Sequence, residues 1–345
     1  MSAFHQSLAY ALGRPSAQGL FRQAPEDFRV NEILGFVPAG EGEHLLVEIN
    51  KRDANTQWVA KQLASFAGLK PVDVGYCGLK DRRAVTTQWF SLYLPKAGDL
   101  DWSTWSLDGV EILQQVRHSR KLRPGMNRGN CFEIRLHRLD ADPVELEKRL
   151  NQVRQQGVPN YFGEQRFGHN EGNIDSAKRM LAGEIRVRDR KLRGLYLSAA
   201  RSLIFNLVLS KRIEHDSWNR AIEGDLLVDS RGDLVVEETE SDLVKNHLDR
   251  LKWHPSGPLW GRGRVQTSAH AAQLEALVVA DEKEFCHGLE HVGLSQERRS
   301  LRLVTQDFEW RFEDDQTLWL SFFLPPGTYA TSVLREILTY RIAAG

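Results

Sequence analysis

The residues best suited to chemistry form a short charged stretch in the first third of the chain. Asp81 stands among three cations, Lys80, Arg82 and Arg83, between two strand-like runs rich in aromatic and β-branched residues. Catalytic groups are often presented on such connections. Neighbouring cations favour the ionised form of a carboxylate, which acts as a nucleophile or a base rather than as an acid. A solvated charged turn would have the same composition.

The motif around Asp81 favours a catalytic carboxylate over a solvated charged turn. Gly78–Thr86 resembles the central motif of the TruD family of tRNA pseudouridine synthases, in which the aspartate is the catalytic nucleophile. Four more segments resemble motifs of that family in the same order: Pro25–Phe28, Arg128–Phe132, Val158–Gly168 and Leu324–Ser332. Five ordered motifs over nearly the whole chain are far more specific than any one of them.

The resemblance implies roles for individual side chains. Asp81 would attack or deprotonate the ribosyl part of a uridine or attack the base, and the sequence leaves these routes open. Arg22 falls where the family places a cation, lysine in many members, that orients the nucleophile; arginine can hold a carboxylate bidentately, which changes the expected geometry. Phe132 would stack the flipped uracil, although a core position in a strand fits it too. Asn130 would hydrogen-bond substrate or loop.

The implied activity is that of an isomerase that converts uridine 13 of tRNA to pseudouridine without cofactor or metal. Its partner would be tRNA, and the enzyme would be a monomer without an obligate protein partner. The alternative is a tRNA-binding or RNA-chaperone protein that does no chemistry. One competing motif, His287-Gly288-Leu289-Glu290-His291, fits the His-x-x-Glu-His pattern of inverted zinc peptidases, but Gly288 weakens a helix there.

Composition is that of an ordinary soluble protein, with 41% hydrophobic and 27% charged residues among 345. Three widely spaced cysteines form neither a disulfide framework nor a metal knuckle, which indicates a reducing cytosol. The N-terminus lacks a signal-peptide pattern, and no uninterrupted apolar run reaches membrane-spanning length. We therefore expect a cytoplasmic protein that makes no membrane contact.

The net charge of zero is unusual for an RNA-binding protein, but the charges are unevenly distributed. One basic cluster runs from Arg117 to Arg128 and a second from Lys178 to Arg193, while acidic residues concentrate between Glu223 and Asp242. Each cluster taken alone could equally be a solvated face. The substrate-binding residues that we predict are Lys80, Arg82, Arg166, Arg188, Arg190 and Lys191. A packed interdomain hinge fits the segment around Arg166 as well.

Patterning indicates an α+β fold. The first part alternates strands with two helices in hairpin-like order, which predicts a mainly antiparallel sheet; the resemblance implies a catalytic domain of the pseudouridine-synthase type. Asn55 or Thr56 can cap the first helix, which ends at Gly68. Asp142-Pro143 begins the second helix, which has a buried stripe of Leu146, Leu150 and Val153 and ends at Gly157. Residues 160–305 are mostly helical, with a strong helix at 198–213 and a small strand pair at 224–238. Strands return after 305, and a helix from about 331 to 342 ends the chain. We predict a discontinuous catalytic domain, 1–159 and 306–345, with an inserted mostly helical α/β domain, 160–305, that clamps the tRNA.

Overall fold

The structure is a computed structural model, and it describes all residues except 1–2, 96–99, 236–238, 240 and 344–345. The chain forms two compact units. The sheet unit comprises Ser16–Leu146, Thr305–Gly327 and Leu338–Gly345, and the helical unit comprises Met1–Pro15, Glu147–Val304 and Thr328–Ile337. Both units are therefore assembled from segments that lie far apart in the sequence.

This division differs from the predicted domain boundaries at three places, and long-range contacts explain why. Arg149 donates hydrogen bonds to the carbonyl oxygens of Gly13 and Leu12 near the N-terminus and of Glu336 near the C-terminus. These contacts tie residues 1–15, the helix after 147 and residues 328–337 into one unit. No local sequence pattern reports such pairings.

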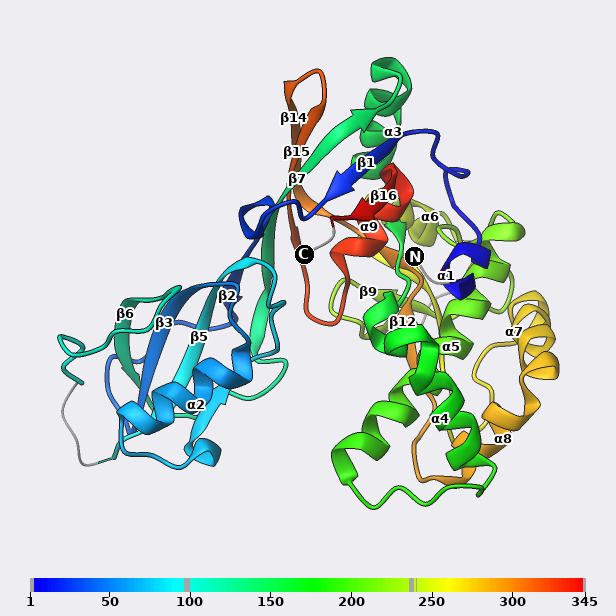
Figure 1. Cartoon of the computed structure of the whole chain (residues 1–345). Coiled ribbons are helices and arrows are strands. Elements are labelled where there is room, and N and C mark those ends of the chain that lie inside the picture. Colours follow the sequence, from blue (N-terminus) through cyan, green and yellow to red (C-terminus); the bar gives the residue numbers. More distant parts are fainter. Residues whose placement is uncertain (1–2, 96–99, 236–238, 240, 344–345) are drawn as a thin grey trace. The chain divides into compact units, whose positions relative to one another are not determined.

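The sheet unit is built on a ten-stranded sheet in the order β14-β15-β7-β2-β5-β3-β6, to which β1, β16 and β4 are added at the side (Figure 1). Its strands are β1 (Gln18–Phe21), β2 (Phe28–Leu34), β3 (His44–Arg52), β4 (Val74–Tyr76), β5 (Val85–Tyr93), β6 (Val110–His118), β7 (Asn127–Asp140), β14 (Gln306–Asp314), β15 (Thr317–Leu324) and β16 (Thr339–Ile342). Among the described strands of this sheet, only the β2–β5 and β1–β16 pairs are parallel. The predicted α+β class with a mainly antiparallel sheet is confirmed.

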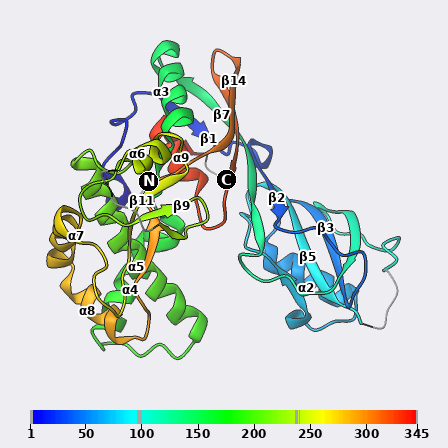
Figure 2. The same ribbon diagram turned by 180° about the vertical axis from the view of Figure 1, so that it is seen from behind.

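One helix, α2 (Thr56–Phe66), covers part of this sheet, in front of it in Figure 1 and behind it in Figure 2. Its N-cap is Asn55, whose side-chain oxygen accepts hydrogen bonds from the amides of Gln57 and Trp58. The buried face of α2, including Val59 and Leu63, packs on the alternate apolar residues of β3 and β5.

The end of the chain does not follow the prediction. The expected helix at about 331–342 ends early, as α9 (Ala330–Ile337), and the next residues form β16. Thr339–Ile342 pair in parallel with β1, and the amide of Thr339 donates to the carbonyl of Ala17. The partner strand lies more than 300 residues away in the sequence. The local pattern therefore predicts a longer helix than the structure has, because it does not show this pairing.

The helical unit holds most of the helices. They are α1 (Ala3–Ser7), α3 (Pro143–Gln156, from Glu147 on), α4 (Gly172–Leu181), α5 (Arg190–Glu214), α6 (Asp242–Asp249), α7 (Ala269–Asp281), α8 (Lys283–His291) and α9. Its strands are β8 (Val158–Pro159), β9 (Leu227–Asp229), β10 (Leu234–Val235), β11 (Trp253–Leu259), β12 (Glu297–Ser300) and β13 (Arg302–Leu303). The predicted pair at 224–238 appears as β9 and β10, and residues 236–238 lie outside the described part.

The central helix α5 begins eight residues earlier than predicted, because Asp189 accepts hydrogen bonds from the amides of Lys191 and Leu192 and caps it. By length and composition, α5 is the one helix in the described part of the chain that could cross a membrane. Core helices pass the same test, and twelve residues of α5, among them Ile204 and Phe205, are buried inside this unit.

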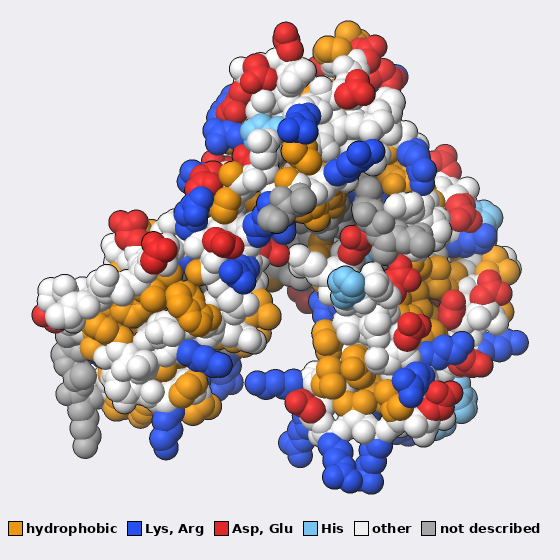
Figure 3. All heavy atoms as spheres, viewed as in Figure 1, with side chains coloured by type: hydrophobic (Ala, Val, Ile, Leu, Met, Phe, Trp, Pro, Cys, Tyr) orange, Lys and Arg blue, Asp and Glu red, His pale blue; other side chains and the backbone are white. Residues whose placement is uncertain are grey.

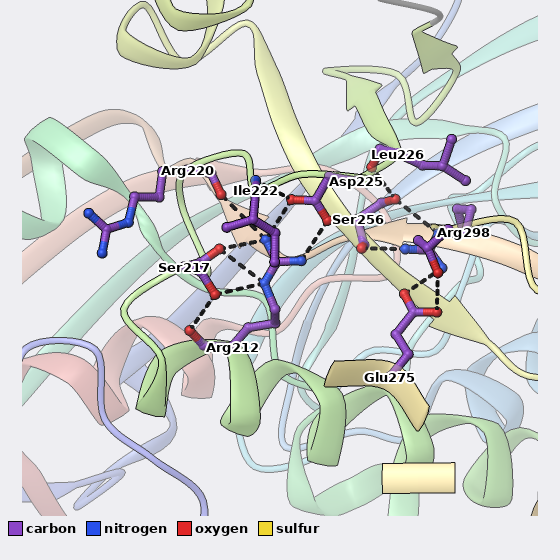
Figure 4. A network of polar contacts seen from close by, with 10 residues as sticks. Arg212, Ser217, Arg220, Ile222, Asp225, Leu226, Ser256, Glu275 and Arg298 are labelled. Carbon is purple, nitrogen blue, oxygen red and sulfur yellow. Dashed lines mark hydrogen bonds and ion pairs between the residues drawn. The ribbon is translucent and has the colours of Figure 1, made fainter. Parts of the chain in front are cut away.

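Two buried ion pairs stand beside α5 (Figure 4). The Arg212 guanidinium contacts both carboxylate oxygens of Asp225, at 2.6 and 2.7 Å, and Arg298 contacts Glu275 at 2.8 Å. Arg212 also donates to the hydroxyl and the carbonyl of Ser217. Because these charges have several partners each, they fix the register of surrounding loops.

Candidate active site

The loop that carries Asp81 joins β4 to β5, and a network of hydrogen bonds from Gln88 and Thr56 holds its backbone. The side-chain amide of Gln88 donates to the Gly78 carbonyl at 2.6 Å. The hydroxyl of Thr56 donates to the Gln88 oxygen at 3.0 Å and accepts from the Lys80 amide at 3.0 Å. Both side chains are buried. The backbone before Asp81 is therefore fixed to β5 and to the first turn of α2.

Arg22 contacts the carboxylate of Asp81, as the sequence predicts. Its Nη2 lies 3.1 Å from Asp81 Oδ2, and the Asp81 side chain remains 30% exposed. Arg22 follows β1 with a left-handed φ of 58°, a conformation that costs about 1 kcal/mol or more for a residue with a side chain. Its guanidinium packs on the rings of Phe28 and Phe21, 4.3 and 4.9 Å from their centroids. The arginine is thus stiffly held.

Lys80 turns inward. Its Nζ lies 2.5 Å from Glu32 Oε2, and these side chains are 7% and 0% exposed. The other oxygen of Glu32 accepts from the Trp89 amide at 3.1 Å. This placement does not support the predicted substrate contact of Lys80, because its charge is already paired inside the sheet unit. Lys80 instead anchors the loop to β2.

The strand register brings the remaining site residues onto one face of the sheet. Phe132 of β7 pairs with Val30 of β2 and with Phe322 of β15. Asn130, two residues earlier on β7, pairs with Glu32 of β2. The ring of Phe132 packs between those of Phe28 and Phe322, with centroids 6.0 and 5.6 Å away. Phe132 is only 8% exposed, so it has the contacts of a core residue.

The side-chain oxygen of Asn130 lacks a hydrogen-bond partner among the described residues. This oxygen, Oδ1, is buried. A side chain at the preceding Gly129 would overlap the Leu324 carbonyl and the Phe323 ring, so glycine is required where β7 and β15 approach closely. A buried acceptor without a protein donor is costly unless a water or a ligand donates to it.

The other predicted contacts are distributed over both units. Arg82 lies in the sheet unit, exposed, with its Nε 3.5 Å from Asp53. Arg166 lies in the helical unit, where its guanidinium donates to the hydroxyls of Tyr329 and Ser198. Arg188, Arg190 and Lys191 belong to the helical unit as well. The structure therefore brings Asp81, Arg22, Asn130 and Phe132 into one unit and assigns the others separately.

Several residues of the site were not predicted to act there. Glu32, Lys51 and Gln88 carry no local signal, because each is on a strand and holds an atom of the Asp81 loop, in another part of the chain. Thr56 was predicted only as a possible helix cap, whereas its hydroxyl serves the loop. Phe28 stands in one of the five motifs, which could have pointed to its contact with Arg22.

The competing zinc-peptidase pattern lies on α8, where the side chains of Glu290 and His291 have other hydrogen-bond partners. Glu290 accepts from the indole nitrogen of Trp260 at 3.0 Å, and His291 Nδ1 lies 2.7 Å from the His287 carbonyl. Gly288 faces Leu181 where α8 approaches α4. Within the described part of the chain, no three His, Cys, Asp or Glu side chains are grouped so that they could hold a metal ion.

The chain is similar to known proteins over nearly its whole length. A family model described as tRNA pseudouridine synthase D matches residues 5–186 and 174–337. The chain is 47% identical to tRNA pseudouridine synthase D of Methylococcus capsulatus over 96% of this chain and 94% of that protein, and 45% identical to that of Nitrosococcus oceani over 99% and 97%. A solved structure from Methanosarcina mazei shares the fold, with a TM-score of 0.71 at 24% identity, covering 96% of this chain and 95% of that one. The chain belongs to the tRNA pseudouridine synthase D family, isomerases that act on tRNA.

Proposed function

We propose that this protein isomerises uridine 13 of tRNA to pseudouridine, with Asp81 as the group that attacks or deprotonates the nucleoside. The reaction breaks the bond between uracil N1 and ribose C1′ and forms one between C5 and C1′. N1 gains a proton and C5 loses one, so no electrons are exchanged with a partner. The protein must supply an anionic group, a support for the released base and a means of taking the base out of its stack.

The observation that carries this proposal is the contact between Arg22 and Asp81 at 3.1 Å on a loop held at Gly78 and Lys80. Since the carboxylate is partly exposed and its direction is fixed, it can meet a substrate without rearrangement, which is the main entropic advantage of a preorganised site. A solvated charged turn would need none of these buried anchors.

Two further residues of the sheet unit, Asn130 and Phe132, would serve a flipped pyrimidine. The unpartnered oxygen of Asn130 can accept a hydrogen bond from the N3–H of uracil. Phe132 would contact the base with the edge of its ring rather than stack on it as the sequence predicts, because the rings of Phe28 and Phe322 pack against its faces. The few kcal/mol needed to unstack a base would then be offset by contacts of the protein with the tRNA backbone.

The direct test uses unmodified tRNA transcripts with uridine or cytidine at position 13. We expect one pseudouridine, at position 13, in the first transcript and none in the second, when the products are mapped by a pseudouridine-specific chemical adduct and primer extension. A non-catalytic RNA chaperone would bind and refold both transcripts without modifying either. Modification at another uridine would contradict the assignment of position 13.

The second basic cluster provides a further prediction. Figure 3 shows Lys and Arg side chains gathered where α4 and α5 are joined. Arg188, Arg190 and Lys191 are exposed there, and none makes an ion pair with any described residue. We expect neutralisation of all three to weaken tRNA binding and to flatten the slope of log K against log salt by about 2–3, if each meets a phosphate. Turnover of bound tRNA should stay nearly unchanged.

Filter-binding titrations across salt, with single-turnover rates beside them, measure this effect. Neutralising Lys245, Arg250 and Lys252 is the matched control, since it removes three exposed positive charges elsewhere on the helical unit. Arg22→Ala should show the reverse pattern, with turnover lowered and affinity nearly kept. An unchanged slope in the triple variant would mean that this cluster is only a solvated face.

A further inference from the structure

Lys51 is a buried cation that touches the main chain of the proposed catalytic aspartate. It is the penultimate residue of β3, and its side chain is completely buried. Its Nζ donates to the Ala54 carbonyl at 2.7 Å and to the Asp81 carbonyl at 3.3 Å. The ammonium group therefore bridges the turn between β3 and α2 to the residue that presents the carboxylate.

The charges around Lys51 are arranged unfavourably for burial. Across the sheet its register partners are Thr86 on β5 and Val110 on β6, which carry no charge. In the part of the chain that the structure describes, Lys51 makes no ion pair. The carboxylate of Glu32 pairs with Lys80. Burial, followed by repulsion from Lys80, lowers the pKa of Lys51 to about 8, and attraction to Asp81 opposes that shift.

An apolar side chain at this position would cost less than a buried ammonium group. The other anchors hold Gly78 and Lys80, before Asp81 in the chain, whereas Lys51 holds the carbonyl of Asp81 itself. We propose that Lys51 is a positioning residue that fixes the Asp81 backbone so that the carboxylate faces Arg22. This inference rests on the proposed function of Asp81.

The first test replaces Lys51 by methionine, which keeps the length of the side chain and removes its donors. We expect the single-turnover rate on unmodified tRNA to fall by about 10–100-fold, because small misplacements of reacting groups have effects of this size. The tRNA dissociation constant should change little. Lys61→Met, which removes an exposed lysine of α2, is the matched control and should keep the wild-type rate.

Thermal unfolding separates positioning from a merely structural role. The unfolded chain holds the Lys51 proton up to its ordinary pKa near 10.5, whereas the folded protein releases it near 8. The unfolded state therefore binds more protons between these values, and wild-type stability rises with pH in this window relative to Lys51→Met. Below pH 8, the methionine variant should be at least as stable as the wild type while it reacts more slowly.

The pH profile gives an independent reading. Above about pH 8 the wild-type protein loses the ammonium charge, so part of its single-turnover rate should disappear there, and Lys51→Met should lack this alkaline decrease. Lys51→Arg, which stays charged, should recover part of the rate and move the decrease to higher pH. If the methionine variant does not fold, the arginine variant and the wild-type profile still decide the question.

Wild-type rates in Lys51→Met would overturn the inference, as would a loss of rate that parallels a loss of stability with no change in pH profile. An Asp81→Asn variant assayed alongside distinguishes a failure of the role of Lys51 from a failure of the proposed function. If Asp81→Asn is inactive and Lys51→Met is unaffected, only the role of Lys51 fails. If Asp81→Asn remains active, the proposed function fails first.

Discussion

Replacement of Asp81 by asparagine is expected to reduce the single-turnover rate by at least about a thousandfold, equivalent to about 4 kcal/mol of activation free energy. Asparagine keeps the shape of the side chain and can still accept the hydrogen bond from Arg22, which lies 3.1 Å from Oδ2. It lacks the negative charge that nucleophilic attack or proton abstraction requires. The affinity for tRNA should stay within a few fold, because contacts with phosphates generally supply much of the affinity of proteins for nucleic acids.

The measurement is the rate of pseudouridine formation at saturating enzyme, with the dissociation constant obtained separately on the same transcript. Asp314→Asn is the matched control: it makes the same substitution in the sheet unit, at the exposed last residue of β14, where asparagine can still accept from the Gln316 amide. Substantial turnover by Asp81→Asn would remove Asp81 from its assigned role, whichever of the three chemical routes is followed.

We expect the largest effect on stability from breaking the buried ion pair between Lys80 and Glu32, which anchors the Asp81 loop to β2. Glu32→Gln leaves the Lys80 ammonium group without its partner at a position where both side chains are almost completely inaccessible. Breaking a buried pair by removing one partner typically costs about 3–5 kcal/mol. Glutamine can still accept from the Trp89 amide, so the loss reports mainly on the charge. We expect the free energy of unfolding to fall by this amount.

A double-mutant cycle with Lys80→Met isolates the pair. If the loss in Glu32→Gln comes from the uncompensated charge of Lys80, the double variant should recover much of the stability, because the two uncharged side chains tolerate burial. Denaturant unfolding of all four proteins measures this. Glu313→Gln is the comparison, since its pairs with Arg135 and Arg311 are partly exposed and should contribute at most about 1 kcal/mol. Equal losses in the two glutamine variants would show that the Lys80–Glu32 charge pair is unimportant.

The features that the sequence determined by itself are those encoded by neighbouring residues. The Asp142-Pro143 start of α3 and its buried stripe of Leu146, Leu150 and Val153 follow from capping and helical spacing, and the structure confirms them. The family follows from five ordered motifs, which the comparisons confirm. The Asp81 loop is also local, because its charges and its flanking strands are contiguous in the chain.

Only the tertiary structure decided what surrounds that loop. Lys51 and Glu32 lie 30 and 48 residues from the residues of the Asp81 loop that they hold. An alternating strand pattern shows which face a side chain occupies but not which strand lies beside it. The same reason explains why the chain ends in β16: Thr339–Ile342 became a strand because β1, over 300 residues earlier, offered an unpaired edge. Periodicity records local geometry, whereas the partners that complete this site are chosen by long-range packing.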